Sequence, residues 1–241
     1  MLHLGIINGR PPKNRLVTVR HYRQPLSWTF DDWSDGDLEL VGANKFPKLE
    51  AFHLDTTDVQ LIRYDEISKS ETPETQVVHF YINDELFTNV MINPSTCMSS
   101  LSNFAAIIGP DISPYATHTS FLRGGSIWYA QAITAYWQRH GLPVIPNLRW
   151  IAQDDLNFYL DTIPHNSAIA ISTLGVSKTK EQRRCLRDGV LRIIREVRPR
   201  QILVHGIDRP DIFDEAKQLS EIHFFKPRIY EATELAGKKH G

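Results

Sequence analysis

The chain has 241 residues, of which 41% are hydrophobic and 23% are charged, and its formal net charge is −1. This composition is typical of a globular protein with a sizeable core, and the length fits one α/β domain better than two small ones. The near-neutral charge argues against a general electrostatic attraction to nucleic acid or to anionic membranes. No apolar stretch approaches the ~20 residues of a membrane span.

The N-terminal residues contain turn-forming sequences such as "NGRPPKNR" and "DDWSDGD". We expect residues 1–45 to be irregular, with one short strand at 16–20, and to pack on a single α/β domain formed by residues 46–241. No cationic segment precedes the short apolar patch at the N-terminus, so we expect a cytoplasmic protein without a signal peptide. The two cysteines, Cys97 and Cys185, lie far apart and are expected to be free thiols.

From residue 46 onward, apolar runs alternate with connections that are partly helical. Strands are predicted at 49–54, 59–64, 77–82, 104–109, 143–148, 168–173, 201–206 and 222–226. Several later runs are continuously apolar, as in strands covered on both faces. A buried helix is predicted over 124–140, ending before Gly141, and an amphipathic helix over 178–198.

Alternation of this kind predicts an α/β fold with a mostly parallel sheet and right-handed crossovers. The number of strands approaches that of a TIM-like barrel, but the helices between the early strands are too short for a standard barrel. A distorted or incomplete TIM-like barrel is therefore favoured, and an open doubly wound sheet is the alternative.

The segment "GLPVIPNLRW" at 141–150 combines a buried apolar run with two prolines. Pro143 can begin a strand, whereas Pro146 removes a hydrogen bond of the ladder and predicts a bend near the strand's end. Asn147, Arg149 and Trp150 would then lie at the carboxyl edge of the sheet. Ligands bind at that edge in both barrels and open α/β sheets.

Over residues 77–206 an ordered set of motifs is present: Asp84 and Phe87 after a strand, "GPDIS" at 109–113, Tyr115, Trp137-Gln138, the 141–150 segment, Ile163-Pro164, "AISTLG" at 170–175, Gly189, Pro199 and "ILVHG" at 202–206. In order and spacing this set resembles an uncharacterised domain of unknown function carried by phages, prophages, plasmids and Gram-positive bacterial genomes. The resemblance implies that the protein is carried by a phage or another mobile element. It does not imply an activity or a cofactor.

One departure from that family's pattern concerns the helix before Trp137-Gln138. The pattern has an Asn and an Arg early in this helix, whereas Ser126 and Tyr129 stand at those positions here. An activity that depended on the Asn–Arg pair would be altered or lost in this chain.

Carboxylates follow two of the predicted strands. Asp111 comes after a strand and a Gly-Pro turn, and Asp84 follows the 77–82 strand. Two carboxylates on neighbouring strand ends suit an acid/base pair or a divalent-cation site. The competing interpretation is that Asp111 caps its own turn together with Ser113.

Other strand ends supply candidate ligand-binding groups. Arg149 suits a phosphate or carboxylate, Trp150 offers a stacking face unless it merely fills the rim of the core, and Asn147 lies beside them. Thr173 lies in "STLG", where hydroxyls and backbone amides could hold a phosphate, although an ordinary turn explains the segment more simply. His205 is a candidate general base.

Between residues 178 and 200 there are nine basic and three acidic residues. A basic face on this helix could follow a phosphate backbone, or it could be a solvated surface. The residues that would contact nucleic acid are Arg183, Arg184, Arg187, Arg195 and Arg198.

The favoured hypothesis is a site at the strand carboxyl ends for a nucleotide, sugar or other small polar ligand, with hydrolysis or group transfer through Asp84, Asp111 and His205. The alternative is a non-catalytic accessory protein that binds nucleic acid or a host protein through the 178–200 helix.

Overall fold

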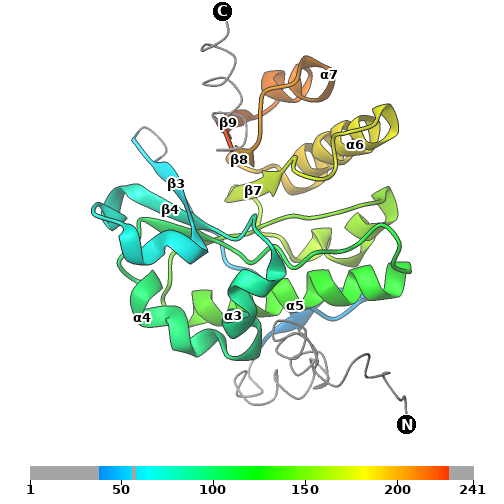
Figure 1. The fold of residues 1–241 in the computed structure, drawn as a ribbon. Helices are drawn as coiled ribbons and strands as arrows, with labels where there is room; N and C mark the ends of the chain where they lie inside the picture. The colour runs from blue at the N-terminus through cyan, green and yellow to red at the C-terminus, as the bar shows by residue number, and fades with distance from the viewer. Residues whose placement is uncertain (1–37, 56–57, 228–241) are drawn as a thin grey trace, which may run out of the picture.

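A computed structural model describes residues 38–55 and 58–227 of the chain (Figure 1). The strands are β1 Leu40–Val41, β2 Phe46–Pro47, β3 Gln60–Arg63, β4 Gln76–His79, β5 Ala106–Ile108, β6 Val144–Ile145, β7 Ala168–Ser172, β8 Gln201–His205 and β9 Glu221–Phe225. The α-helices are α3 Thr88–Ile92, α4 Met98–Leu101, α5 Ser120–Arg139, α6 Lys180–Val197 and α7 Pro210–Phe213. Short 3₁₀ turns lie at Tyr64–Lys69, Pro73–Thr75, Asp84–Phe87, Pro94–Cys97, Gln153–Phe158, Leu160–Thr162 and Ala216–Gln218.

Strands β3 to β9 form two parallel ladders, in the orders β3-β4-β5-β6 and β7-β8-β9. A single parallel bridge between Asn147 and Ala170 connects them. Around it, Leu148 N donates to Ala170 O at 2.9 Å and Ala170 N donates to Pro146 O at 2.8 Å. The predicted α/β class and the parallel pairing of the later strands are confirmed.

The strand order follows the order of the chain, and the sheet curves around its inner face. Both ladders contribute to this inner cluster, which contains Val77, Tyr81, Ala106, Ile108, Ile145, Ala168, Ala170 and Leu203. Strands β5, β6 and β7 separate β4 from β8, yet the rings of His79 on β4 and His205 on β8 lie 4.7 Å apart. The described strands therefore curl toward each other without forming a closed barrel.

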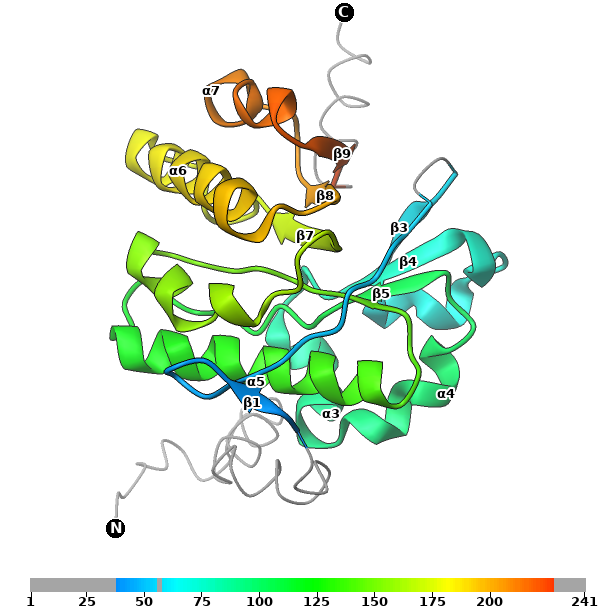
Figure 2. The same ribbon diagram turned by 180° about the vertical axis from the view of Figure 1, so that it is seen from behind.

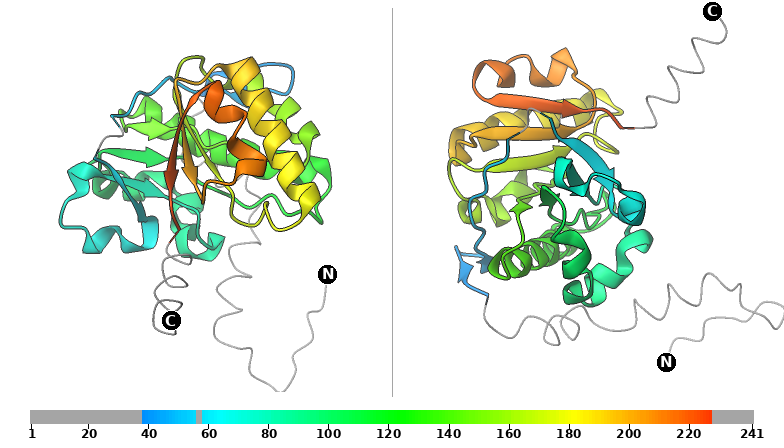
Figure 3. Two further views of the ribbon diagram at one scale, coloured as in Figure 1. Left: turned by 90° about the horizontal axis from the view of Figure 1, so that it is seen from above. Right: turned by 90° about the vertical axis from the view of Figure 1, so that its left-hand side faces the viewer.

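Helices cover the outer face of the curved sheet. Figure 1 shows α5 along one side, with α6 and α7 on the opposite side, and Figure 3 shows α7 between β9 and α6. The buried face of α5 packs with β4, β5 and β6, and the apolar stripe of α6 packs with β7 and β8. Helices α3 and α4, between β4 and β5, are only five and four residues long, which confirms that the helices between the early strands are short.

Local sequence sets the limits of the two long helices. Thr119 caps α5, and the chain leaves this helix through Gly141, whose φ of +82° favours glycine. Thr179 and Gln182 form a capping box at the start of α6. The predicted helices at 124–140 and 178–198 are thus confirmed. No helix in the described part of the chain is both long and apolar enough to cross a membrane.

The strand predicted at 49–54 was wrong. The segment runs across the sheet instead of joining it (Figure 2), because side chains supply much of its backbone hydrogen bonding. Glu50 N donates to Gln138 Oε1 at 2.8 Å and Phe52 N donates to Ser167 Oγ at 3.0 Å. At the far end, Gln201 Nε2 donates to Leu54 O.

Strand β6 is shorter than predicted, since it ends before Pro146 and the chain then turns from β5 toward β7. The bend expected at this proline is therefore present. The strand predicted at 16–20 lies outside the described residues.

Candidate ligand-binding cleft

A cleft of about 260 Å³ opens at the carboxyl ends of β5, β6 and β7, beside the first turns of α6. It is lined by Ser113, Pro114, Tyr115, Ala116, Arg149, Trp150, Ile151, Gly175, Val176, Gln182, Cys185 and Leu186. Among the described residues of this lining, Arg149 is the one charged side chain, and most of the other groups are apolar. The cleft therefore combines an apolar wall with a single fixed cation.

Arg149 is held in place by the strand ends. Its Nη1 donates to Ser172 O at 3.4 Å and its Nη2 donates to Leu174 O at 3.2 Å. Its Nε lies 3.8 Å from Asp111 Oδ1, and this buried nitrogen has no hydrogen-bond partner among the described residues. The guanidinium is thus oriented, while part of its donor capacity is unused.

Asp111 does not line the cleft but lies behind Arg149, with only 11% of its side chain exposed. Asn147 Nδ2 donates to Asp111 Oδ1 at 3.2 Å, and Tyr81 Oη donates to Asn147 Oδ1 at 3.0 Å. This chain of hydrogen bonds fixes the carboxylate beside the guanidinium. The geometry makes Asp111 the counter-ion of Arg149.

Asp84, rather than Asp111, caps the turn after β5. It accepts hydrogen bonds from Ser113 N at 3.2 Å and from Ser113 Oγ at 2.9 Å. Burial raises the pKa of Asp84, and the nearby Asp111 carboxylate raises it further, although the bonds from Ser113 oppose both effects. In the described part of the chain no group of three or more His, Cys, Asp or Glu side chains could hold a metal ion.

His205 lies on the inner face of the sheet and outside the lining of the cleft. Its ring stacks on Tyr81, with centroids 4.8 Å apart and an interplanar angle of 13°, and its Nδ1 lies 3.3 Å from Ser172 Oγ. Burial lowers the pKa of His205 to about 4. At neutral pH the imidazole is therefore uncharged and part of the polar interior.

Two residues of this interior network, His79 and Tyr81, were missed from the sequence. Tyr81 N donates to His79 Nδ1 at 3.2 Å, and both rings contact His205. The alternation in "VVHFYI" would have indicated them, because it places His79 and Tyr81 on the same face as Val77.

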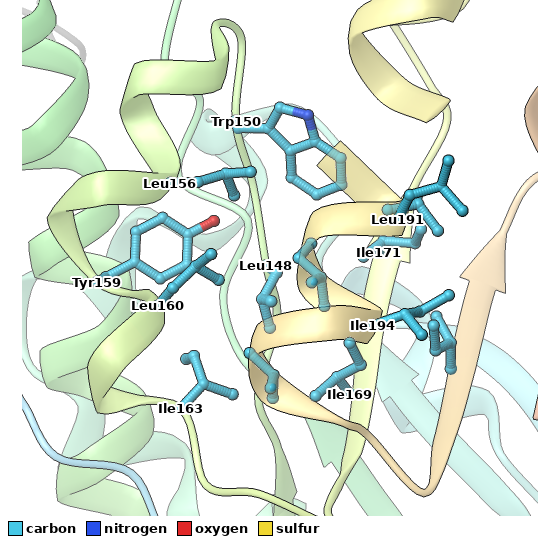
Figure 4. Close-up of a cluster of buried hydrophobic side chains, with 14 of the residues drawn as sticks. Leu148, Trp150, Leu156, Tyr159, Leu160, Ile163, Ile169, Ile171, Leu191 and Ile194 are labelled. Atoms are coloured by element: carbon cyan, nitrogen blue, oxygen red, sulfur yellow. The ribbon is translucent and has the colours of Figure 1, made fainter. Parts of the chain in front are cut away.

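Trp150 forms a wall of the cleft and at the same time belongs to the buried cluster between the sheet and α6. Figure 4 shows its indole with Leu156 on one side and Leu191 on the other. Its ring lies against Gly189 of α6, where a Cβ atom would come within 2.4 Å of the indole nitrogen. The packing role expected as the alternative for Trp150 is therefore present, and only part of the ring can face a ligand.

Thr173 is also away from the cleft lining. Its side chain packs on Gly206, and its backbone N donates to His205 O at 3.1 Å. The structure thus brings Asp111, Asn147 and Arg149 together and links them through Tyr81 to His205, whereas Thr173 takes a packing position.

The sequence did not indicate a binding role for four residues of the lining, which are Tyr115, Val176, Gln182 and Leu186. They come from two loops and a helix, and no local pattern shows that these segments meet.

At the two positions that depart from the family pattern, one side chain connects α5 to α3 and the other bonds within α5. Tyr129 is buried in the core and donates to Met91 O, and Ser126 Oγ lies 3.4 Å from Leu122 O. Neither residue lines the cleft.

Several arginines of α6 lie close to acidic side chains. Arg183 Nε lies 2.6 Å from Asp211 Oδ2, and Arg187 and Arg184 approach Asp188 at 2.8 Å and 3.7 Å. Arg195 and Arg198 are exposed. The face is therefore less positive than its arginines alone would make it.

Comparison with known proteins places the chain among phage-related sequences. The family model described as a domain of unknown function (DUF4417) matches residues 38–225. The gene 1 protein of Mycobacterium phage L5 is 27% identical over 129 residues, which cover 54% of this chain and 56% of that protein. The gene 1 protein of Mycobacterium phage D29 is 26% identical over 129 residues, covering 54% of this chain and 48% of that protein. The match thus spans about half the length of these relatives. No solved structure matches the chain.

Proposed function

We propose that this chain, which belongs to the DUF4417 family, binds a small organic anion in the cleft at the strand carboxyl ends. The observation that carries the proposal is Arg149, an oriented guanidinium that is the one charge in an otherwise uncharged lining. The phage origin of its relatives supports a role in a phage or another mobile element.

The charge of the cleft favours a carboxylate or phosphate group on the ligand. A guanidinium presents planar donors that match these groups, and the apolar wall lowers the local dielectric and strengthens the attraction. The walls formed by Tyr115, Val176 and Leu186 suit an apolar or aromatic body. The volume of about 260 Å³ suits a small molecule.

Hydrolysis or group transfer through Asp84, Asp111 and His205 stays a prediction. None of these three side chains lines the cleft, and Asp84 and Asp111 are engaged with Ser113 and Arg149. Binding is therefore the function that the geometry supports, and no chemical step is assigned. Nucleic-acid binding through α6 has weaker support, since Asp188 and Asp211 offset part of its charge.

The proposal is tested by calorimetric titration with phenyl phosphate as the anionic probe. We expect phenyl phosphate to bind, and benzyl alcohol and benzylammonium to bind at least about tenfold more weakly, because they lack the group that meets Arg149. Arg149→Met should remove this preference, since it keeps much of the side chain's length without its charge.

Arg195→Met is the matched control, because Arg195 is exposed on α6 and lies outside the cleft lining. It should bind phenyl phosphate like the unmodified chain. Equal binding of all three probes, or no binding, would overturn the proposal. Salt-sensitive binding of duplex DNA that Arg195→Met weakens would support the nucleic-acid alternative instead.

A further inference from the structure

The capping box of α6 borders the cleft. Gln182 Oε1 accepts hydrogen bonds from Lys178 N at 2.9 Å and from Thr179 N at 3.1 Å. In return, Thr179 Oγ1 accepts from Gln182 N at 3.2 Å. Because these backbone groups are donors, they orient the side-chain amide, with its oxygen toward the helix start and its Nε2 as the remaining donor group.

The Nε2 group of Gln182 has no protein acceptor among the described residues, and Gln182 lines the same cleft as Arg149. Two other polar side chains of the lining already donate within the protein. Ser113 Oγ donates to Asp84, and Cys185 Sγ donates to Ile151 O. Arg149 and Gln182 are therefore two donor groups presented by the described residues of the cleft.

We propose that Gln182 is a specificity-determining residue, whose Nε2 group donates a second hydrogen bond to the anionic group bound by Arg149 and so helps the cleft to select anions. This inference rests on the proposed function and adds a requirement to it. A helix cap alone would not need the amide, because a capping box forms equally well with glutamate, and an acidic side chain is favoured at a helix N-terminus. Glutamate would, however, place a second charge in the cleft and remove the donor.

Gln182→Glu separates the two roles of this side chain. The capping box should survive, so the urea midpoint of unfolding should stay equal to or above that of the unmodified chain. Binding of phenyl phosphate should weaken by roughly tenfold or more, the size expected for replacing a favourable hydrogen bond to an anion by an unpaired like charge. Calorimetry measures the affinity, and circular dichroism measures the unfolding.

Gln218→Glu is the matched charge control, since Gln218 is exposed and lies outside the cleft lining. It should leave the affinity unchanged. If Gln182→Glu binds phenyl phosphate as tightly as the unmodified chain while Arg149→Met does not, the role of Gln182 is refuted and the proposed function stands. If neither variant changes the affinity, both are refuted.

Discussion

At the scale of single residues, the polar interior holds both charged and uncharged groups. Arg149 is charged and held by carbonyl oxygens and Asp111, whereas His205 lies between aromatic rings and is neutral. In the described part of the chain one cation therefore faces the cleft, while the imidazole contributes packing and a hydrogen bond.

His205 should make the protein less stable in mild acid. Its folded pKa of about 4 lies below the unfolded value of 6.5, so above pH 6.5 it is neutral in both states. As the pH falls from 6.5 toward 4, the unfolded chain takes up the proton first, and this lowers the free energy of unfolding by up to about 3 kcal/mol. Urea unfolding at pH 7.5 and pH 4.5 measures the loss.

His205→Phe keeps a ring against Tyr81 and removes the titrating group. Between pH 7.5 and pH 4.5 the variant should lose about 2.5 kcal/mol less than the unmodified chain. This comparison separates the effect of His205 from that of Asp84. The pKa of Asp84 is raised in the folded state, which therefore binds that proton more readily, so acid raises the contribution of Asp84 to the free energy of unfolding. Identical pH dependence in the two proteins would show that His205 does not control it.

At the scale of elements, α6 leaves space for Trp150, which forms a wall of the cleft. The helix has a glycine in its middle, Gly189, and the indole of Trp150 occupies the space that a side chain would fill. The same helix contributes the capping box and part of the cleft lining. Its position thus sets both the packing of Trp150 and the width of the cleft.

Gly189→Ala should destabilise the protein although alanine favours helices. The new Cβ would meet the indole at 2.4 Å, and overpacking of this kind costs typically ~1–3 kcal/mol, against a gain of about 1 kcal/mol in helix propensity. Gly125→Ala on α5 is the matched control, because a Cβ atom added there would meet nothing within 4 Å and the variant should gain about 0.5–1 kcal/mol. Equal stabilisation of both variants in urea unfolding would contradict this account of Trp150.

At the scale of the whole molecule, the inner cluster unites the two ladders. Leu203 from β8 packs with Val77 and Ile108 from β4 and β5, although the ladders share a single bridge. We therefore expect one unfolding transition, followed identically by far-ultraviolet circular dichroism and tryptophan fluorescence.

Leu203→Ala should lower the free energy of unfolding by ~2–5 kcal/mol and keep the two probes coincident. Leu219→Ala provides the comparison, because Leu219 is exposed and its truncation should change stability by less than about 0.5 kcal/mol. Separate transitions for the two probes would show that the ladders unfold independently.

Much of the fold could be predicted from the sequence. The apolar run "AIAIS" predicts a buried strand, and the apolar stripe of α6 predicts the face of the helix that packs on the sheet. The carboxyl-end location of Arg149 and Asn147 followed from the same argument. The approach of Gln182 and Tyr115 to Arg149 could not be predicted, because it depends on where two loops and a helix meet. The strand predicted at 49–54 was wrong for a related reason. Side chains distant in sequence accept hydrogen bonds from Glu50 N and Phe52 N, where a neighbouring strand would otherwise do so.

That segment also implies an unequal tolerance to substitution along the chain. The side chains of Gln138, Ser167 and Gln201 bond to the main chain of Glu50, Phe52 and Leu54, and Ala168 N adds a main-chain bond to Phe52 O. The side chains of Glu50, Ala51 and His53 are exposed, so we expect substitutions there to be tolerated. Apolar replacement of Gln138, Ser167 or Gln201 would instead leave part-buried main-chain groups without a partner, which gives the glutamine of the Trp137-Gln138 motif a physical role in this fold.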